Sequence, residues 1–245
     1  MIGNIGYYAI FVLLVIASGG FVGLIDKITK LQLKLLLGFS GGYLIALSFL
    51  HLAPEAYAGI GMTAGYYILG GFVLQLILEF FSKGIEHGHL HVHDVENRFP
   101  LALFVSLCVH SFLEGMPVIE HNHGVDGHEH HASNQLIIGI LLHKIPVTIV
   151  LVSTLIHAKV SRWKVFSLLI FFALTMPLGS MFSFFFAHEL EGTAVNFYSI
   201  SSSIVIGILL HIATTILFES SEEHKFNLQK FLSILLGIGV YLLFA

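Results

Sequence analysis

The sequence has few charged residues and a single cysteine, and both shortages limit what the protein can be. Only 11% of its 245 residues are charged, whereas 56% are hydrophobic and the mean hydropathy is +0.89. A soluble globule of this length needs more polar side chains to cover its surface, so lipid is the expected solvent. The lone Cys108 excludes an intramolecular disulfide and a thiolate metal cage. Any bound metal must therefore be held by nitrogen and oxygen ligands.

Several classes of function lack their usual sequence features. No basic segment is interleaved with aromatic residues, so we expect no nucleic-acid partner. No glycine-rich phosphate loop is present, which argues against a nucleotide-driven pump. A membrane-embedded zinc-dependent hydrolase is the alternative function from another class, but its His-Glu-x-x-His helix is missing. We therefore expect that the protein is not an enzyme and carries no resident cofactor.

Long apolar stretches follow one another along the whole chain. Each is long enough to cross a hydrocarbon layer about 30 Å thick at about 1.5 Å per residue. The predicted spans are residues 4–25, 33–57, 63–83, 100–118, 135–157, 164–187, 199–219 and 228–244. The first lacks the preceding Lys or Arg of a signal peptide, so we interpret it as a span. The sequence thus predicts an all-α integral membrane protein, an eight-transmembrane-helix bundle forming a single domain over residues 1–245.

Basic residues alternate between the loops that join these spans. All but one of the 11 lie in or beside the odd-numbered loops: Lys27, Lys30, Lys34, Lys83, Arg98, Lys159, Arg162, Lys164, Lys225 and Lys230. Cytoplasmic loops carry the excess of Lys and Arg in membrane proteins. The pattern therefore places the odd-numbered loops in the cytoplasm and both termini on the outer side.

The fourth and fifth spans contain ionisable residues near their middles. His110 and Glu114 are four residues apart, which puts them on one face of a helix. His143 lies in the next span, an expected antiparallel neighbour. An ionisable group at this depth costs about 2.5 to 3.5 kcal/mol on insertion scales, so a functional role is the default interpretation. Two imidazoles and a carboxylate match the ligands of zinc and leave a fourth position open. The alternative is hydrogen bonding within the bundle without any ion.

Lys144, directly after His143, is the basic residue that falls inside a span. A protonated ammonium beside a metal site repels the ion unless it pairs with Glu114 or loses its proton through desolvation. One interpretation is that Lys144 supplies a tethered positive charge in place of a second metal ion. The other is that it snorkels or points into a different polar cavity.

Polar residues outside these two spans suggest a path for an ion. His51 and Glu55 are four residues apart near the outer end of the second span, where they suit an entrance or an interfacial helix-end cluster. Two histidine-rich loops are predicted, a cytoplasmic loop 84–99 and an external loop 119–134. Their histidines are His87, His89, His91 and His93 in the first and His121, His123, His128, His130 and His131 in the second. This composition favours metal capture over simple polar disorder.

Two motifs resemble the ZIP family of metal transporters. The fourth span carries His-x-x-x-Glu-Gly from His110, and the fifth carries His-x-Ile-Pro from His143. The run from His51 to Glu55, Glu79 near the end of the third span, and the loop 84–99 are also similar to this family. The resemblance covers nearly the whole chain. It implies a secondary transporter that moves a divalent ion into the cytoplasm by an elevator-like slide.

By this resemblance His110, Glu114 and His143 are the transport-site ligands. Ser111 and Lys144 stand where many members hold a second ion, and both are poor ligands. Val147 stands where the family usually has His or Glu. These departures predict a site for a single metal ion.

The seventh span also departs from the family pattern. It carries His211 and ends near Glu219, where members more often show an acidic residue ahead of Pro-Glu. His211 is a candidate further ligand, although a lone histidine in a helix is often hydrogen-bonded within the bundle. Glu219 is a candidate for the transport path.

Zinc is the expected cargo. Iron, manganese and cadmium are the alternatives, because mixed imidazole and carboxylate sites accept several divalent ions. The remaining expectations are a lipid bilayer as surroundings, the plasma (inner) membrane as location, and a homodimer as a candidate assembly.

Overall fold

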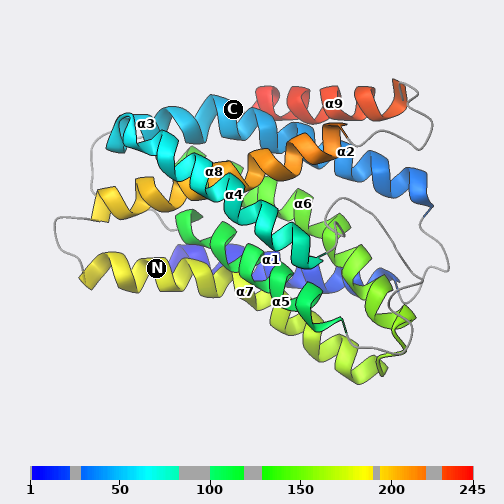
Figure 1. Cartoon of the computed structure of the whole chain (residues 1–245). Helices are drawn as coiled ribbons and strands as arrows, with labels where there is room; N and C mark the ends of the chain where they lie inside the picture. Colours follow the sequence, from blue (N-terminus) through cyan, green and yellow to red (C-terminus); the bar gives the residue numbers. More distant parts are fainter. Residues whose placement is uncertain are drawn as a thin grey trace.

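The structure is a computed structural model that describes residues 2–22, 29–82, 100–118, 129–189, 194–218 and 228–244. Within these ranges every element is helical and no strand occurs. The elements are α1 (Ile2–Val22), α2 (Lys30–Leu47), η1 (Ser48–Leu52), α3 (Ala53–Ile60), α4 (Thr63–Ser82), α5 (Leu101–Gly115), η4 (Met116–Val118), α6 (Glu129–His157), α7 (Arg162–Glu189), α8 (Ala194–Phe218) and α9 (Leu228–Phe244). Figure 1 shows the helices packed side by side, with the start of α1 and the end of α9 at the same end of the bundle.

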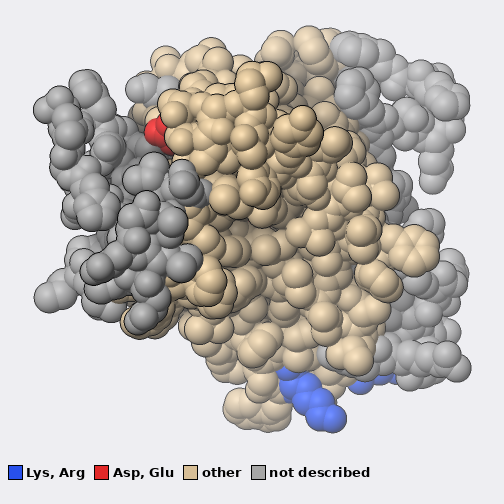
Figure 2. Space-filling view, turned by 60° about the vertical axis from the view of Figure 1, so that its left-hand side comes forward, with Lys and Arg blue, Asp and Glu red and all other residues tan. Residues whose placement is uncertain are grey.

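Six described helical segments are long and apolar enough to cross a membrane. They are Leu31–Ile60, Thr63–Phe81, Leu101–Val118, Gln135–His157, Arg162–Phe186 and Phe197–Leu217. Two shorter apolar helices accompany them, Gly6–Gly20 and Leu228–Phe244. Large apolar side chains point outward, such as Phe80 at 79% exposed and Leu243 at 81%. Figure 2 shows one broad face that carries few charges, with described Lys and Arg gathered at its lower edge.

Two helices, α4 and α9, begin at the predicted residues, whereas the others begin elsewhere. α2 begins at Lys30 and not at 33, because Thr29 and Gln32 form a capping box in which each side chain bonds the other's backbone amide. α6 begins at Glu129, ahead of the predicted 135. Hydropathy marks where a helix becomes apolar, whereas the backbone continues through polar turns. The sequence pattern therefore found the apolar parts of these helices and missed their polar ends.

Three pairs of helices approach each other closely through glycine, and each glycine faces the backbone of its partner helix. Between α2 and α9, a Cβ on Gly42 would meet the carbonyl of Ile234, and one on Gly237 would meet that of Phe39. Small residues permit such contacts in lipid, where dispersion and not the hydrophobic effect holds helices together.

The same reciprocal arrangement joins α4 to α8 and α5 to α7. The glycines and the residues whose backbone they face are Gly71 and Ile204, Gly207 and Ile68, Gly115 and Met176, and Gly179 and Phe112. α6 lies between these pairs, in contact with α2, α1 and α7. The middle of α6 is therefore enclosed by other helices, and it carries His143 and Lys144.

Candidate metal centre

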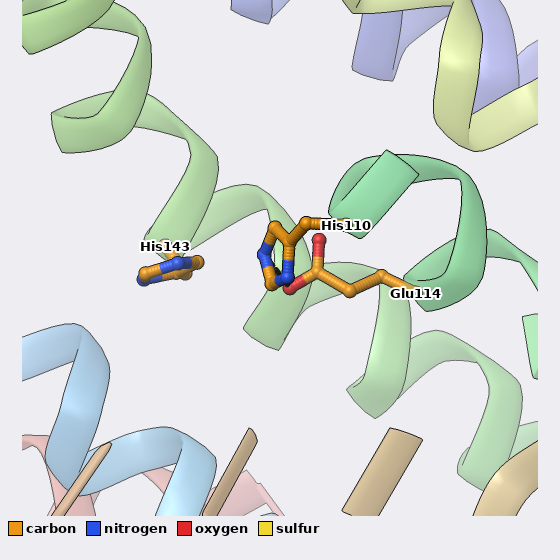
Figure 3. A group of neighbouring side chains, drawn as sticks. All are labelled: His110, Glu114 and His143. Carbon is orange, nitrogen blue, oxygen red and sulfur yellow. Dashed lines mark ion pairs between the residues drawn. The ribbon is translucent and has the colours of Figure 1, made fainter. Parts of the chain in front are cut away.

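Three side chains that can ligate a metal converge inside the bundle. His110 and Glu114 come from α5 and His143 from α6, and each is fully buried at 0% exposed. One ligand atom from each residue lies within 4.8 Å of the other two. Figure 3 shows His110 and Glu114 side by side on α5, with the ring of His143 beside them on α6. We call these three residues the trio.

A third helix, α4, orients His110. Its Nδ1 lies 3.1 Å from Oε1 of Gln75 on α4, and Gln75 is also fully buried. Because an amide oxygen can only accept, His110 Nδ1 donates this bond. The other ring nitrogen, Nε2, lies 3.0 Å from Glu114 Oε1. Both of these atoms can ligate a metal ion.

Sequence reasoning missed Gln75. It is a single amide within an otherwise apolar stretch of the third span, and a polar residue at that depth needs a partner on another helix. That signal marks Gln75 as noteworthy but does not identify His110 as the partner. Hydrogen bonds from the outer side of a metal-binding histidine fix its tautomer and ring orientation, so Gln75 is a positioning residue for the trio.

Lys144 pairs with the trio. Its Nζ lies 2.6 Å from Glu114 Oε2 and the side chain is 1% exposed. The ammonium also lies 5.2 Å from the centre of the Phe172 ring on α7, within cation–π range. Lys144 therefore pairs with Glu114, and its proposed role in place of a second metal ion stays a prediction. Snorkelling towards the membrane surface does not occur.

The two other positions linked to a second ion are also buried. Ser111 and Val147 are each 1% exposed. Ser111 Oγ has no hydrogen-bond partner among the described residues. Val147 contributes no ligand atom at all, because its side chain is a hydrocarbon. Among the described residues, the metal-ligating cluster contains no carboxylate or imidazole beyond the trio itself.

His211 lies outside the trio in this structure. Its Nε2 is 3.3 Å from Glu79 Oε2 on α4, and its ring meets that of Phe72 edge to face at 4.8 Å between centroids. Glu79 stands one helical turn after Gln75 on the same face of α4. On this face of α4, Gln75 contacts His110 of the trio, and Glu79 contacts His211 one turn further along. A role for His211 as a ligand stays a prediction.

The predicted outer pair is brought together on the second helical segment. His51 Nε2 lies 3.4 Å from Glu55 Oε1, and the two side chains are 24% and 40% exposed. His51 belongs to η1, a π-helical insertion between α2 and α3. Such wider turns are frequently found at functional sites. The side chains are partly exposed, but His51 Nε2 and Glu55 Oε2 are themselves buried.

The remaining predicted residues cannot be placed. Glu219 and the histidines of both loops lie outside the described residues, except for the backbone of His130 and His131 in the first turn of α6. The side chains of these two also lie outside the described part. Metal capture by the loops stays a prediction.

The trio has the chemical properties of an open zinc site. It offers two imidazole nitrogens and one carboxylate, the ligand types that zinc takes, and leaves room for a water or another group in a fourth position. Burial of three ionisable groups among apolar helices is costly, and a bound cation offsets that cost. The arrangement offers three ligand atoms to a divalent ion.

Known proteins similar to this chain are zinc transporters and a related protein. Zinc transporter ZIP9 of Micropogonias undulatus is 27% identical over 176 residues, which is 67% of this chain and 52% of that protein. Zinc transporter ZIP9-B of Xenopus laevis matches to the same extent, and Protein zntD of Dictyostelium discoideum is 29% identical over 170 residues. The chain spans about half the length of the ZIP9 proteins and 24% of zntD.

The model of the ZIP Zinc transporter family matches residues 87–245, well over half of the chain. The match includes α5 and α6 and therefore all three residues of the trio. The apolar helices described above agree with a protein embedded in lipid. The chain is an integral membrane protein and belongs to the ZIP zinc transporter family.

Proposed function

We propose that this protein carries zinc into the cytoplasm through the trio by alternating access. The observation that supports this most strongly is the meeting of His110, Glu114 and His143, fully buried, with ligand atoms within 4.8 Å of one another. Family membership and the names of the ZIP9 relatives agree with zinc as cargo. A site with an open fourth position suits transport, since an ion that must be released cannot be held in a closed cage.

The bundle is proposed to cross the membrane eight times, with both termini outside. In addition to the six long segments, α1 and α9 would each make one crossing, tilted little because they are short. Lys159, Arg162 and Lys164 cluster where α6 joins α7, at the end of the bundle away from the start of α1. An excess of basic residues at that end supports a cytoplasmic position for it. On this proposal, residues 1–245 form one transport domain.

The helices divide into two groups that support a sliding motion. We call α1, α5, α6 and α7 the moving unit, because the trio and the glycine-mediated α5–α7 contact lie within it. We call α2, α3, α4, α8 and α9 the static unit, which contains the other two glycine-mediated pairs. The bond from Gln75 to His110 joins the two units, so it belongs to this conformation and must break when the trio slides.

The ion's path is proposed to run along polar pairs on either side of the trio. His51 and Glu55 would receive it at the outer end, and Glu79 with His211 would take it towards the cytoplasmic end. Both pairs combine an imidazole with a carboxylate, as the trio does. The histidine-rich loops would bind metal at the two mouths, and Glu219 would lie on the inner path.

A single ion is proposed to occupy the trio. Ser111 and Val147 are weak or absent ligands, and Lys144 already places a positive charge beside Glu114. A second cation next to that ammonium would be repelled in a medium of low dielectric constant. Iron, manganese and cadmium would compete with zinc for these ligands. A homodimer in the plasma (inner) membrane is the proposed assembly and location.

Uptake into vesicles tests this function. Purified protein in liposomes should accumulate radioactive zinc, and Glu114→Ala and His143→Ala should abolish the accumulation. The matched control is His157→Ala, which removes an exposed histidine on the same helix as His143. Loss of uptake in this control as well, or normal uptake in the Glu114 variant, would refute the proposed site. Turnover of a lipid without zinc movement would instead support the hydrolase alternative.

A further inference from the structure

Both oxygens of the Glu114 carboxylate lie close to a nitrogen of another side chain. Oε1 lies 3.0 Å from His110 Nε2, and Oε2 lies 2.6 Å from Lys144 Nζ. Glu114 is 0% and Lys144 1% exposed, so water does not screen the pair. Both residues belong to the moving unit, on α5 and α6. The pair therefore stays intact if that unit slides.

A carrier that works by alternating access must also return without its ion. The trio alone would then carry an uncompensated carboxylate through a dry environment, which is strongly unfavourable. The empty site with Lys144 has formal charges of −1 and +1, which cancel. The structure thus holds a cation that is always present, is covalently attached and occupies an oxygen that zinc would use.

We propose that Lys144 acts as a tethered substitute for the transported ion: it neutralises Glu114 while the empty site returns, and zinc displaces it. This inference rests on the proposed transport function. In this role Lys144 does not hold zinc. It lets the empty site return without a second ion, so that the transporter can carry zinc in one direction only.

The displaced ammonium has a second location within reach. Phe172 presents its ring 5.2 Å from Nζ and attracts the charge through its π face. Thr148 follows Lys144 by one helical turn on α6, is fully buried, and its Oγ1 has no hydrogen-bond partner among the described residues. A buried hydroxyl normally has a partner, so this oxygen is available to accept from the ammonium once zinc holds Glu114.

Two transport assays on one variant test this role. Net uptake into zinc-free vesicles needs the return of the empty site, whereas exchange of radioactive zinc across vesicles filled with unlabelled zinc does not. Lys144→Met keeps the length of the side chain and removes the charge. We expect net uptake to fall on the order of 100-fold, as for a buried pair that loses one partner, and exchange to change by less than about threefold. Lys164→Met, at an exposed position, is the control and should change neither.

The outcomes separate this inference from the function on which it rests. If wild-type protein shows neither exchange nor net uptake, the proposed function is wrong. If Lys144→Met retains both activities, or loses both while remaining folded by size-exclusion chromatography, the role given to Lys144 is wrong.

A second variant decides the matter even if Lys144→Met does not fold. Thr148→Val preserves shape and removes the hydroxyl, so the displaced ammonium loses its acceptor. Zinc binding should weaken about tenfold. Unchanged zinc binding in Thr148→Val would overturn the second location.

Discussion

The bond between Gln75 and His110 yields the sharpest prediction about the trio. Gln75→Leu removes the acceptor of His110 Nδ1 while keeping a side chain of similar size. Both residues are fully buried, so the donor left behind has no water to bond. An unsatisfied buried donor costs about 1 to 3 kcal/mol, and about 1.4 kcal/mol corresponds to a factor of ten in affinity. We therefore expect the zinc Kd to rise about 10- to 100-fold, the range found when outer-shell partners of metal ligands are removed.

The measurement is a calorimetric titration of purified protein in detergent with zinc. The matched control is Gln135→Leu, which removes another buried amide, one that donates from Nε2 to the carbonyl of Phe244 at 3.1 Å and does not touch the trio. The control should bind zinc as the wild type does. Equal zinc affinity for wild type and Gln75→Leu would show that Gln75 does not position His110. An equal loss in both variants would show a general effect of losing a buried amide.

Three further predictions follow from named contacts. Gly71→Ala should lower the free energy of unfolding by about 1 to 3 kcal/mol, seen as a lower thermal midpoint in detergent, because its Cβ would meet the backbone of α8. Gly70→Ala, with no atom within 4 Å, should not lower it, and equal behaviour of the two would contradict the packing argument. Glu79→Gln should slow zinc uptake without changing the zinc Kd of the trio, because Glu79 pairs with His211 on another helix; a changed Kd would refute the separation of the two sites. Val147→His places an imidazole one turn after His143 and should tighten zinc binding about tenfold in calorimetry; unchanged binding would show that position 147 does not face the ion.

The parts of the site that sequence could predict lie within single helices. His110 and Glu114 are four residues apart, and helical geometry alone places them together. The meeting with His143 followed because consecutive spans joined by a loop are usually neighbours. Apolar length predicted where the helices cross lipid, but it could not find the polar turns at the starts of α2 and α6.

The rest of the site depends on contacts between helices that periodicity does not reveal. Gln75 on α4 bonds His110 on α5. The face that α4 turns towards α5 depends on helix packing around glycines such as Gly71. The direction of Lys144 was undecided for the same reason, since a long side chain can reach several partners. His211 was a candidate ligand from its place in the seventh span, and the structure pairs it with Glu79 on α4, one turn after Gln75.

The number and position of bound zinc ions test the central claim most directly. Anomalous diffraction at the zinc edge from zinc-soaked crystals should show a single peak between His110, Glu114 and His143, at about 2.0 to 2.2 Å from the ligand atoms. A peak at other residues with none in the trio, or two peaks within it, would contradict the account.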